Sequence, residues 1–363
     1  MKYRIEKEKG LPAYRQLYEL LRADIVSGVY PYGSKLPSKR LIAEETGVSV
    51  ITAEHSLALL CDEGYAASRE RSGYFVAFRP SDGFASPAGS LPRPRAEEHR
   101  SPSATVDFPF SVLTKTMRRV IADRGETILE KAPEEGLPEL RAAVARYLAR
   151  SRGITVGADQ IIIGSGSESL YRLMIDLLGH GRVYAFESPS YKKIEQIYRA
   201  SGVRCAALPL GADGIDSAAL WHSDADVLHI TPYRSFPSGV TASASKRHEY
   251  LNWSCSRPGY LIEDDFESEF SVSRKPEETL FALSADRSGN VLYLNSFSRT
   301  ISPALRTSYL VLPPALAERR RETVGYYSCA VPTFEQYLIA SLLDSGEFER
   351  NINRVRRIKR RQG

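Results

Sequence analysis

The stretch IIIGSGSESLYRL at residues 161–173 joins a run of β-branched residues to a glycine- and serine-rich turn and then to a helical pattern. This order predicts a strand, a tight turn and a helix. At the start of such a helix, backbone N–H groups together with Ser165 or Ser167 face an anion. Many loops of α/β proteins have this composition, so the turn indicates an anion site only where other features agree with it.

The residues around this stretch repeat its alternation of strand and helix. From Thr105 onward, short apolar runs such as RVYAF, DVLHI, YLIED and NVLYL are interleaved with helical patterns. Strands that alternate with helices predict an α/β domain with a largely parallel sheet. We therefore expect one such domain over residues 105–363.

A second polar turn lies between two strands near the end of this domain. The stretch NSFSRTISPALRTSYLVLP, residues 295–313, places Ser296, Ser298 and Arg306 around it. Hydroxyl groups and a guanidinium crowded into one turn are groups that bind an anion. The turn therefore supports the anion site indicated by residues 161–173.

The stretch IEDDFESEF, residues 262–270, ends a strand with consecutive carboxylates. Because side chains alternate across a strand, Asp264 and Phe266 share one face, while Asp265 lies on the other. A carboxylate at a strand end is as often a helix cap or a surface charge as a ligand-binding group. Both interpretations of Asp264 stay open at this point.

The first 78 residues have a different pattern, in which a helix, two short helices and a hairpin follow one another. Ser38 and Ser49 are suitable N-caps for the second and third helices, and Gly47 ends the second. The turn between these helices has helix-turn-helix length. Helix, helix-turn-helix and hairpin form the order of a winged helix, although a small protein-interaction module is an alternative.

In a helix-turn-helix, the start of the third helix meets base edges, and basic residues around it meet phosphates. The residues expected to contact DNA are Lys35, Lys39, Arg40, Ser49, Val50, Thr52, His55, Arg69 and Arg71.

Composition limits the other possibilities. Residues 79–104 are rich in Pro, Ser, Gly and charge, which predicts a flexible linker. The net charge is +5, but residues 350–363 contain seven basic and no acidic residues, and subtracting these leaves −2 for the rest. The basic character therefore comes from the tail and is no argument for DNA binding elsewhere.

The four cysteines lie far apart without a CxxC, which indicates neither zinc nor disulfides. The charged start lacks a signal peptide and no window is apolar enough to span a membrane, so we expect a cytoplasmic protein.

Both parts resemble known families. LPSKRLIAEETGVS at residues 36–49 is similar to the GntR-type winged helix, although that family usually has a basic residue where this chain has Val50. Residues from about 107 onward, including FESPSY, TPYRSFPSGVT and IEDDFESEF, resemble a fold-type-I aminotransferase domain that binds pyridoxal 5′-phosphate. The combination is similar to the MocR subfamily of GntR regulators. The resemblance implies cofactor contacts by Gly166, Ser167, Tyr191, Asp264, Ser296, Ser298 and Arg306.

Several positions depart from the aminotransferase pattern. Arg299 occupies the position of the lysine that forms an imine with the cofactor aldehyde, and an arginine stays protonated and cannot form that imine. Phe266 replaces a tyrosine, and Arg234 and Ser235 replace a His-Gln pair. Relatives also continue into a small C-terminal lobe, so the resemblance implies that the domain is incomplete here. We therefore expect no catalytic residue.

The favoured function is a DNA-binding transcriptional regulator with a degenerate aminotransferase-like effector domain. Its expected partners are double-stranded DNA, a second copy of the chain and a small-molecule effector, either pyridoxal phosphate held without a covalent bond or an amino compound. One alternative is a working aminotransferase with an appended DNA-binding domain, which Asp264 and Arg306 favour and Arg299 opposes. A truncated remnant without a ligand site is another, and an engineered lysine-to-arginine change would also explain Arg299.

Overall fold

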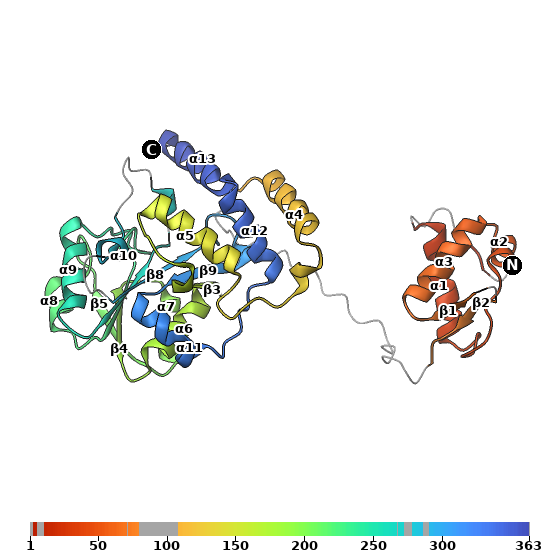
Figure 1. The fold of residues 1–363 in the computed structure, drawn as a ribbon, viewed down its shortest axis with the longest axis horizontal. Helices are drawn as coiled ribbons and strands as arrows, with labels where there is room; N and C mark the ends of the chain where they lie inside the picture. The colour runs from red at the N-terminus through yellow and green to blue at the C-terminus, as the bar shows by residue number, and fades with distance from the viewer. Residues whose placement is uncertain are drawn as a thin grey trace. The chain divides into compact units, whose positions relative to one another are not determined.

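The computed structural model describes residues 3–5, 11–70, 72–79, 108–266, 268–271, 278–285 and 290–362. The chain divides into two compact units, residues 1–100 and 101–363 (Figure 1). The linker expected at residues 79–104 lies outside the described residues, apart from Arg79. Within the described ranges, no helix is both long and apolar enough to cross a membrane.

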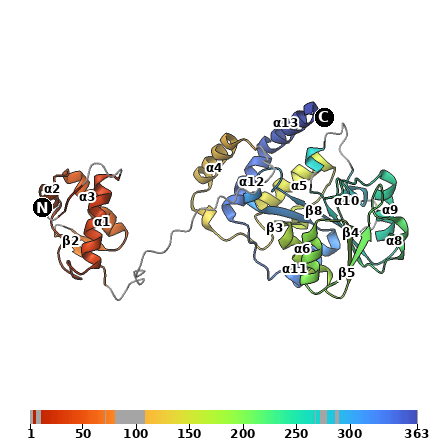
Figure 2. The ribbon, with the colours of Figure 1, turned by 180° about the vertical axis from the view of Figure 1, so that it is seen from behind.

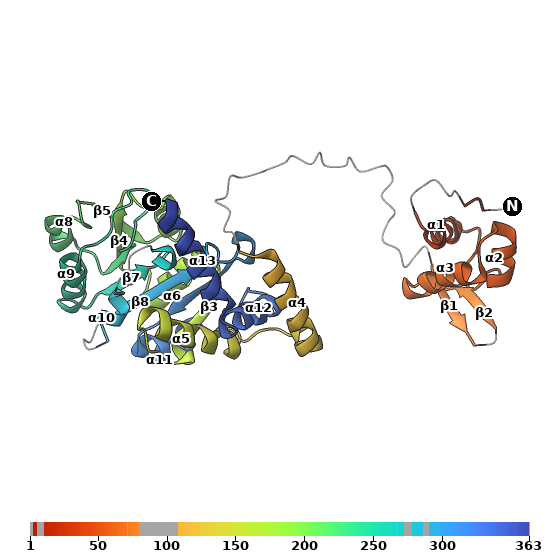
Figure 3. The same ribbon diagram turned by 90° about the horizontal axis from the view of Figure 1, so that it is seen from above.

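The first unit is a winged helix, as the sequence predicts. Its elements are α1 (Ala13–Val26), α2 (Lys39–Thr46), α3 (Val50–Asp62), β1 (Ala66–Arg69) and β2 (Gly73–Val76). Ser38 accepts the N–H of Leu41, and Ser49 accepts the N–H of Thr52, so both predicted caps are present. The antiparallel hairpin of β1 and β2 follows α3 and forms the wing (Figure 3).

The core of this unit comes from the apolar faces of its helices. Leu17 and Leu21 of α1 pack with Leu57 and Leu60 of α3, and all four side chains are fully buried. Gly47 ends α2 with a φ of 70°, a left-handed conformation that glycine adopts without strain. The packing and the turn together fix α3 against α1 and α2, leaving its opposite face to solvent.

The second unit is built on a seven-stranded sheet. The strands are β3 (Ile161–Ser165), β4 (Val183–Ser188), β5 (Arg204–Pro209), β6 (Val227–Ile230), β7 (Tyr260–Asp264), β8 (Val291–Ser296) and β9 (Thr307–Val311). Their order is β3-β9-β8-β7-β6-β4-β5. All neighbours are parallel except β9, which runs antiparallel to both β3 and β8. The largely parallel sheet predicted from the sequence is confirmed.

Helices cover both faces of this sheet. The α-helices are α4 (Phe110–Arg124), α5 (Pro138–Arg152), α6 (Ser167–Leu178), α7 (Lys192–Ala200), α8 (Ser217–His222), α9 (Ala244–Cys255), α10 (Leu280–Leu283), α11 (Pro314–Val324), α12 (Thr333–Asp344) and α13 (Glu347–Gln362). Short 3-10 helices are η2 (Gly125–Leu129), η3 (Ala158–Gln160), η4 (Ser268–Phe270) and η5 (Pro303–Leu305).

Alternating side chains of the strands divide the core between the two faces. Ile162 and Leu310 pack on one face beneath α6, α7 and α11, where α6 and α11 lie side by side (Figure 2). Ile163 and Tyr309 pack on the other face beneath α5, α12 and the start of α13. That second face is completed by α8, α9 and α10 over β5, β6 and β7. The result is a three-layer α/β/α unit.

The strand directions decide where a site can form. β3, β4, β6, β7 and β8 all end at the same edge of the sheet, because β9 alone runs against the others. Ligands of open α/β sheets bind outside the carboxyl ends of the strands. The predicted anion-binding turn after β3, the carboxylate at the end of β7 and the turn after β8 therefore meet at one edge.

Candidate functional sites

A pocket of about 320 Å³ lies at this edge of the sheet. The structure brings together in it all seven residues that the aminotransferase resemblance implies as cofactor contacts. They line it with Glu168, Tyr171, Ile194, Thr231, Phe236, Phe266 and Arg299. Its polar groups come from the start of α6, the ends of β7 and β8, and the segment between β8 and β9.

One end of the pocket is suited to a phosphate group. Helix α6 begins after Gly166 without a side-chain cap, so its first N–H groups can face an anion. Gly166 has a φ of 79°, and a Cβ added to it would lie 2.8 Å from Nη2 of Arg306. Only glycine lets the guanidinium lie this close to the turn. Arg306 itself has a φ of 40°, so the backbone is strained where this side chain enters the pocket.

A carboxylate already occupies this end. Glu168, in the first turn of α6, lies 3.3 Å from Nη2 of Arg306 through its Oε2. Its Oε1 accepts a hydrogen bond from Lys193 of α7. The hydrogen bond from Lys193 lowers the pKa of Glu168 and in turn raises the pKa of Lys193. Glu168 is therefore an anion at neutral pH, held between two cations.

Asp264, which also lines the pocket, is contacted by a tyrosine and a histidine. Its Oδ2 accepts a hydrogen bond of 2.6 Å from the Tyr171 hydroxyl, and Nε2 of His229 lies 3.4 Å away. The other ring nitrogen of His229 lies 2.6 Å from the Tyr198 hydroxyl. Burial, reinforced by the charge of Asp264, raises the pKa of Tyr171 well above its usual range. The tyrosine therefore stays a hydrogen-bond donor and fixes the carboxylate in place.

The turn after β8 closes one side of the pocket. The Ser296 hydroxyl accepts the N–H of Ser298 at 3.1 Å, so it stabilises the turn as well as lining the pocket. The guanidinium carbon of Arg299 lies 5.1 Å from the centre of the Phe266 ring, within cation–π distance. Arg299 thus enters the same pocket as Asp264. A charged guanidinium thus lies in the pocket at the position where the resemblance implies a reactive amine.

An aromatic pair also lines the pocket. Tyr191, at the N-terminal end of α7, and Phe236 meet edge to face with ring centres 6.4 Å apart. Both residues are exposed, at 40% and 61% of their surface. Exposed aromatic faces beside a polar pocket can stack on a planar ring. This placement of Tyr191 fits the ring-stacking position that the resemblance implies.

Behind Asp264, the other face of β7 carries a separate buried network. Asp265 accepts hydrogen bonds of 2.5 Å from Arg152 and 2.6 Å from the Tyr293 hydroxyl. Burial raises the pKa of Glu263 to about 8 and that of Glu269 to about 7. The predicted alternation is correct, since Asp264 points to the pocket while Glu263 and Asp265 belong to this network.

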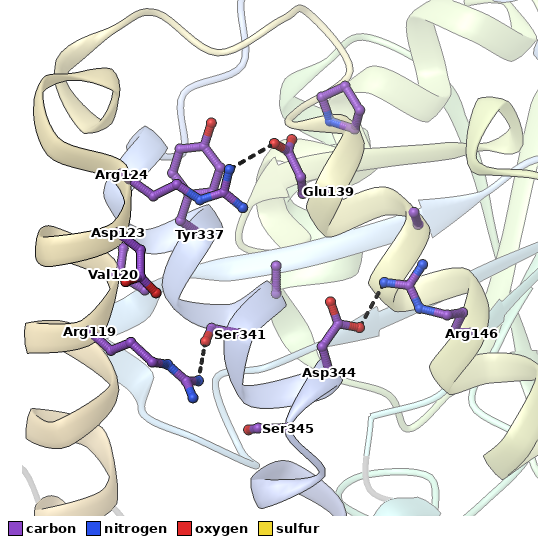
Figure 4. A pocket seen from close by; sticks show the side chains of 13 residues that line it. Arg119, Val120, Asp123, Arg124, Glu139, Arg146, Tyr337, Ser341, Asp344 and Ser345 are labelled. Carbon is purple, nitrogen blue, oxygen red and sulfur yellow. Dashed lines mark hydrogen bonds and ion pairs between the residues drawn. The ribbon is translucent and has the colours of Figure 1, made fainter.

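A larger cavity, of about 660 Å³, lies between α4, α5 and α12 (Figure 4). Its arginines are already engaged. Arg124 pairs with Glu139, Arg146 pairs with Asp344, and Arg119 donates to Ser341. These surface contacts hold the three helices together. The cavity contains none of the sequence-predicted site residues, so we place the chemistry in the smaller pocket.

In the first unit, the residues expected to contact DNA lie around the start of α3 and the wing. Ile51 is 78% exposed, and Val50, His55, Arg40, Lys35 and Arg69 are also exposed. Lys39 lies 2.6 Å from Glu54, so part of its charge is neutralised on this face. Ser49 and Thr52 are joined through their hydroxyls. His55 stacks on Tyr14, and Arg69 on Phe75. Arg71 lies outside the described residues.

Three residues in or next to the candidate pocket were not singled out from the sequence. Glu168 was predicted only as part of a turn, and Tyr171 only as part of the following helix. The signal for Tyr171 was its spacing of four residues from Ser167, which puts both on one face of α6. The signal for His229 was that it is the single polar residue in an apolar strand, a pattern typical of a buried side chain that hydrogen-bonds another buried polar group.

Among the described residues, no group of three possible metal ligands occurs.

Comparisons with known proteins match both units. The family described as bacterial regulatory proteins, gntR family, matches residues 13–76. The family described as aminotransferase class I and II matches residues 103–362. The solved structure of the α-aminoadipate aminotransferase LysN from Thermus thermophilus, complexed with N-(5′-phosphopyridoxyl)-L-leucine, has a TM-score of 0.59 and 28% identity. The match covers 69% of this chain and 64% of the enzyme chain.

Two relatives match across both units. The "Uncharacterized HTH-type transcriptional regulator YdeL" of Bacillus subtilis is 30% identical over 99% of this chain and 79% of its own length. The "Probable rhizopine catabolism regulatory protein MocR" of Rhizobium meliloti is 27% identical over 98% of this chain and 76% of its own length. The chain therefore belongs to the MocR-type DNA-binding transcriptional regulators, in which a gntR-family domain is joined to an aminotransferase class I and II domain.

Proposed function

We propose that the aminotransferase-like unit of this regulator is an effector domain that binds pyridoxal phosphate reversibly, without a covalent bond. The alternative effector is an amino compound that binds in the same pocket. The observation that carries the proposal is the composition of the pocket. The pocket contains groups that can bind a phosphate and a ring nitrogen, and Arg299 lies where the resemblance implies the reactive amine.

The residues present fit pyridoxal phosphate. The start of α6, Ser298 and Arg306 would hold the phosphate, and the space left by Gly166 allows close approach. Tyr191 would stack on the ring. Asp264, fixed by Tyr171, would pair with the ring nitrogen and keep it protonated. When bound, the cofactor supplies an electron sink, and this chain's residues bind and orient it.

Transamination is the second candidate, because the carboxylate and the phosphate-binding groups are both in place. It also needs an amine that loses its proton, attacks the aldehyde and later moves a proton on the substrate. A guanidinium side chain does none of these, so Arg299 cannot take the place of that amine. We therefore assign this chain ligand binding and no catalytic residue.

For the first unit we propose that the start of α3 meets base edges while Arg40, Lys35 and the wing meet phosphates. The cap at Ser49 places Val50 and Ile51 at the exposed end of α3. This is the part of a recognition helix that enters the major groove. Because Val50 is apolar, we expect it to contact a thymine methyl group or sugar rather than a phosphate.

Changing Arg40 to Ala in the full chain tests this assignment. Removing one phosphate contact should weaken binding to operator and unrelated DNA alike and reduce the slope of log K against log salt by about 1. Fluorescence anisotropy at several salt concentrations measures both. Arg22→Ala is the matched control, because Arg22 lies on α1 and donates to Tyr65. Equal salt slopes for wild type and Arg40→Ala would show that Arg40 does not meet DNA.

The proposal extends to the assembly and its location. We expect two copies to pair, so that two recognition helices meet two half-sites of one operator. The protein would act where its DNA is, in the cytoplasm. Ligand binding in the pocket would then be the signal that changes DNA binding by the first unit.

A further inference from the structure

Glu168 is a carboxylate that lines the pocket beside the groups proposed to bind a phosphate. It lies in the first turn of α6, where the helix N-terminus favours negative charge. It lies 3.3 Å from Arg306, the cation that would also bind the ligand phosphate. The site therefore contains its own carboxylate in contact with the groups that would receive the ligand's anion.

A carboxylate and a phosphate compete for the same guanidinium. Arg306 can donate two parallel hydrogen bonds to a phosphate, but one of its Nη atoms now faces Glu168. A dianionic phosphate bound here would also meet the negative charge of Glu168. Lys193 offsets part of this charge, since it donates to the other oxygen of Glu168. The Arg306 and Glu168 side chains are 53% and 35% exposed, so solvent screens the repulsion without removing it.

We propose that Glu168 competes with the ligand phosphate for Arg306 and thereby weakens the phosphate end of the pocket. This inference rests on the proposed function, because it assigns a role to a residue of the same site. The ligand exchanges quickly, because Arg299 forms no covalent bond with it and Glu168 competes with its phosphate for Arg306. Such a pocket responds to ligand concentration instead of retaining a cofactor permanently.

The test is the binding of three probes to the full chain and to the variant Glu168→Gln. The probes are pyridoxal phosphate, pyridoxal, which lacks the phosphate, and inorganic phosphate, with affinities measured by isothermal titration calorimetry. Glutamine keeps the size of the side chain and removes its charge. We expect Glu168→Gln to bind pyridoxal phosphate and inorganic phosphate at least about tenfold more tightly, while its affinity for pyridoxal changes by less than about twofold.

Glu195→Gln is the matched control. Glu195 lies on α7 in an exposed pair with Arg199 and does not line the pocket, so its loss tests whether any nearby negative charge has the same effect. Thermal melting of both variants shows whether the fold is kept. Unchanged phosphate affinity in a folded Glu168→Gln, or equal tightening for pyridoxal, overturns this inference alone when the wild type binds pyridoxal phosphate. If neither the wild type nor Glu168→Gln binds pyridoxal phosphate, both the inference and the proposed ligand are wrong.

Discussion

The variant Arg299→Lys should become covalently labelled by pyridoxal phosphate at position 299, where the wild type carries no label. The side chain at 299 enters the pocket beside Phe266, which also holds Asp264 and Arg306. A lysine there lies near a cation and is partly buried, and both conditions lower the pKa of an amine. The amine can then attack the cofactor aldehyde, which the phosphate and ring contacts hold in the pocket.

Borohydride reduction followed by peptide mass spectrometry locates the label. Surface lysines react with free aldehyde at random, so the informative quantity is the fraction labelled on the peptide that contains residue 299. Arg306→Lys is the matched control, because it introduces the same amine elsewhere in the pocket. We expect labelling of Arg299→Lys to approach one per chain and that of the control at residue 306 to stay at background. Equal labelling in both variants would mean that the pocket does not orient the aldehyde.

The second large effect is on stability. Arg152→Ala should lower the free energy of unfolding by about 3–5 kcal/mol, because it leaves the buried Asp265 carboxylate without its cation. The two side chains are only 3% and 5% exposed, and they lie 2.5 Å apart. Since Asp265 directly follows Asp264, the change should also displace the carboxylate of the pocket. Denaturant unfolding measures the loss.

Arg150→Ala is the control for this variant. Arg150 lies on the same helix and pairs with Glu349, but its side chain is 53% exposed, so we expect a loss below about 1 kcal/mol. The double variant Arg152→Met, Asp265→Asn removes both charges and should recover most of the stability. Similar losses for Arg150→Ala and Arg152→Ala would contradict the assignment of Arg152 as a buried anchor.

Local features of the fold could be predicted from the sequence because local chemistry decides them. Ser38 and Ser49 cap their helices as predicted, since the cap depends on residues only three positions away. The alternation that separates Asp264 from Asp265 depends only on strand geometry. The common edge of β3, β7 and β8 followed from a parallel sheet. This is why the predicted contact residues line one pocket, although their role as ligand contacts remains a proposal.

Contacts between distant segments could not be predicted in this way. Asp265 and Arg152 are 113 residues apart, and no pattern in either segment identifies the other. Glu168 meets Lys193 from the next helix and Arg306 from beyond β8, so its role depends on the fold. The strand β5, RCAALP, was not singled out from the sequence, because its burial is partial and none of its residues is β-branched.

The most direct test of the account compares pyridoxal phosphate with pyridoxine phosphate, in which an alcohol replaces the aldehyde, as ligands of the wild-type full chain. A pocket that uses only the phosphate, the ring and its nitrogen should bind both compounds at one site per chain, release both on dialysis, and differ in affinity by less than about tenfold, or 1.4 kcal/mol. Equilibrium dialysis gives the affinities and the stoichiometry. Retention of pyridoxal phosphate after dialysis with no binding of the alcohol, or no saturable binding of either compound, would contradict a reversible, non-covalent effector site.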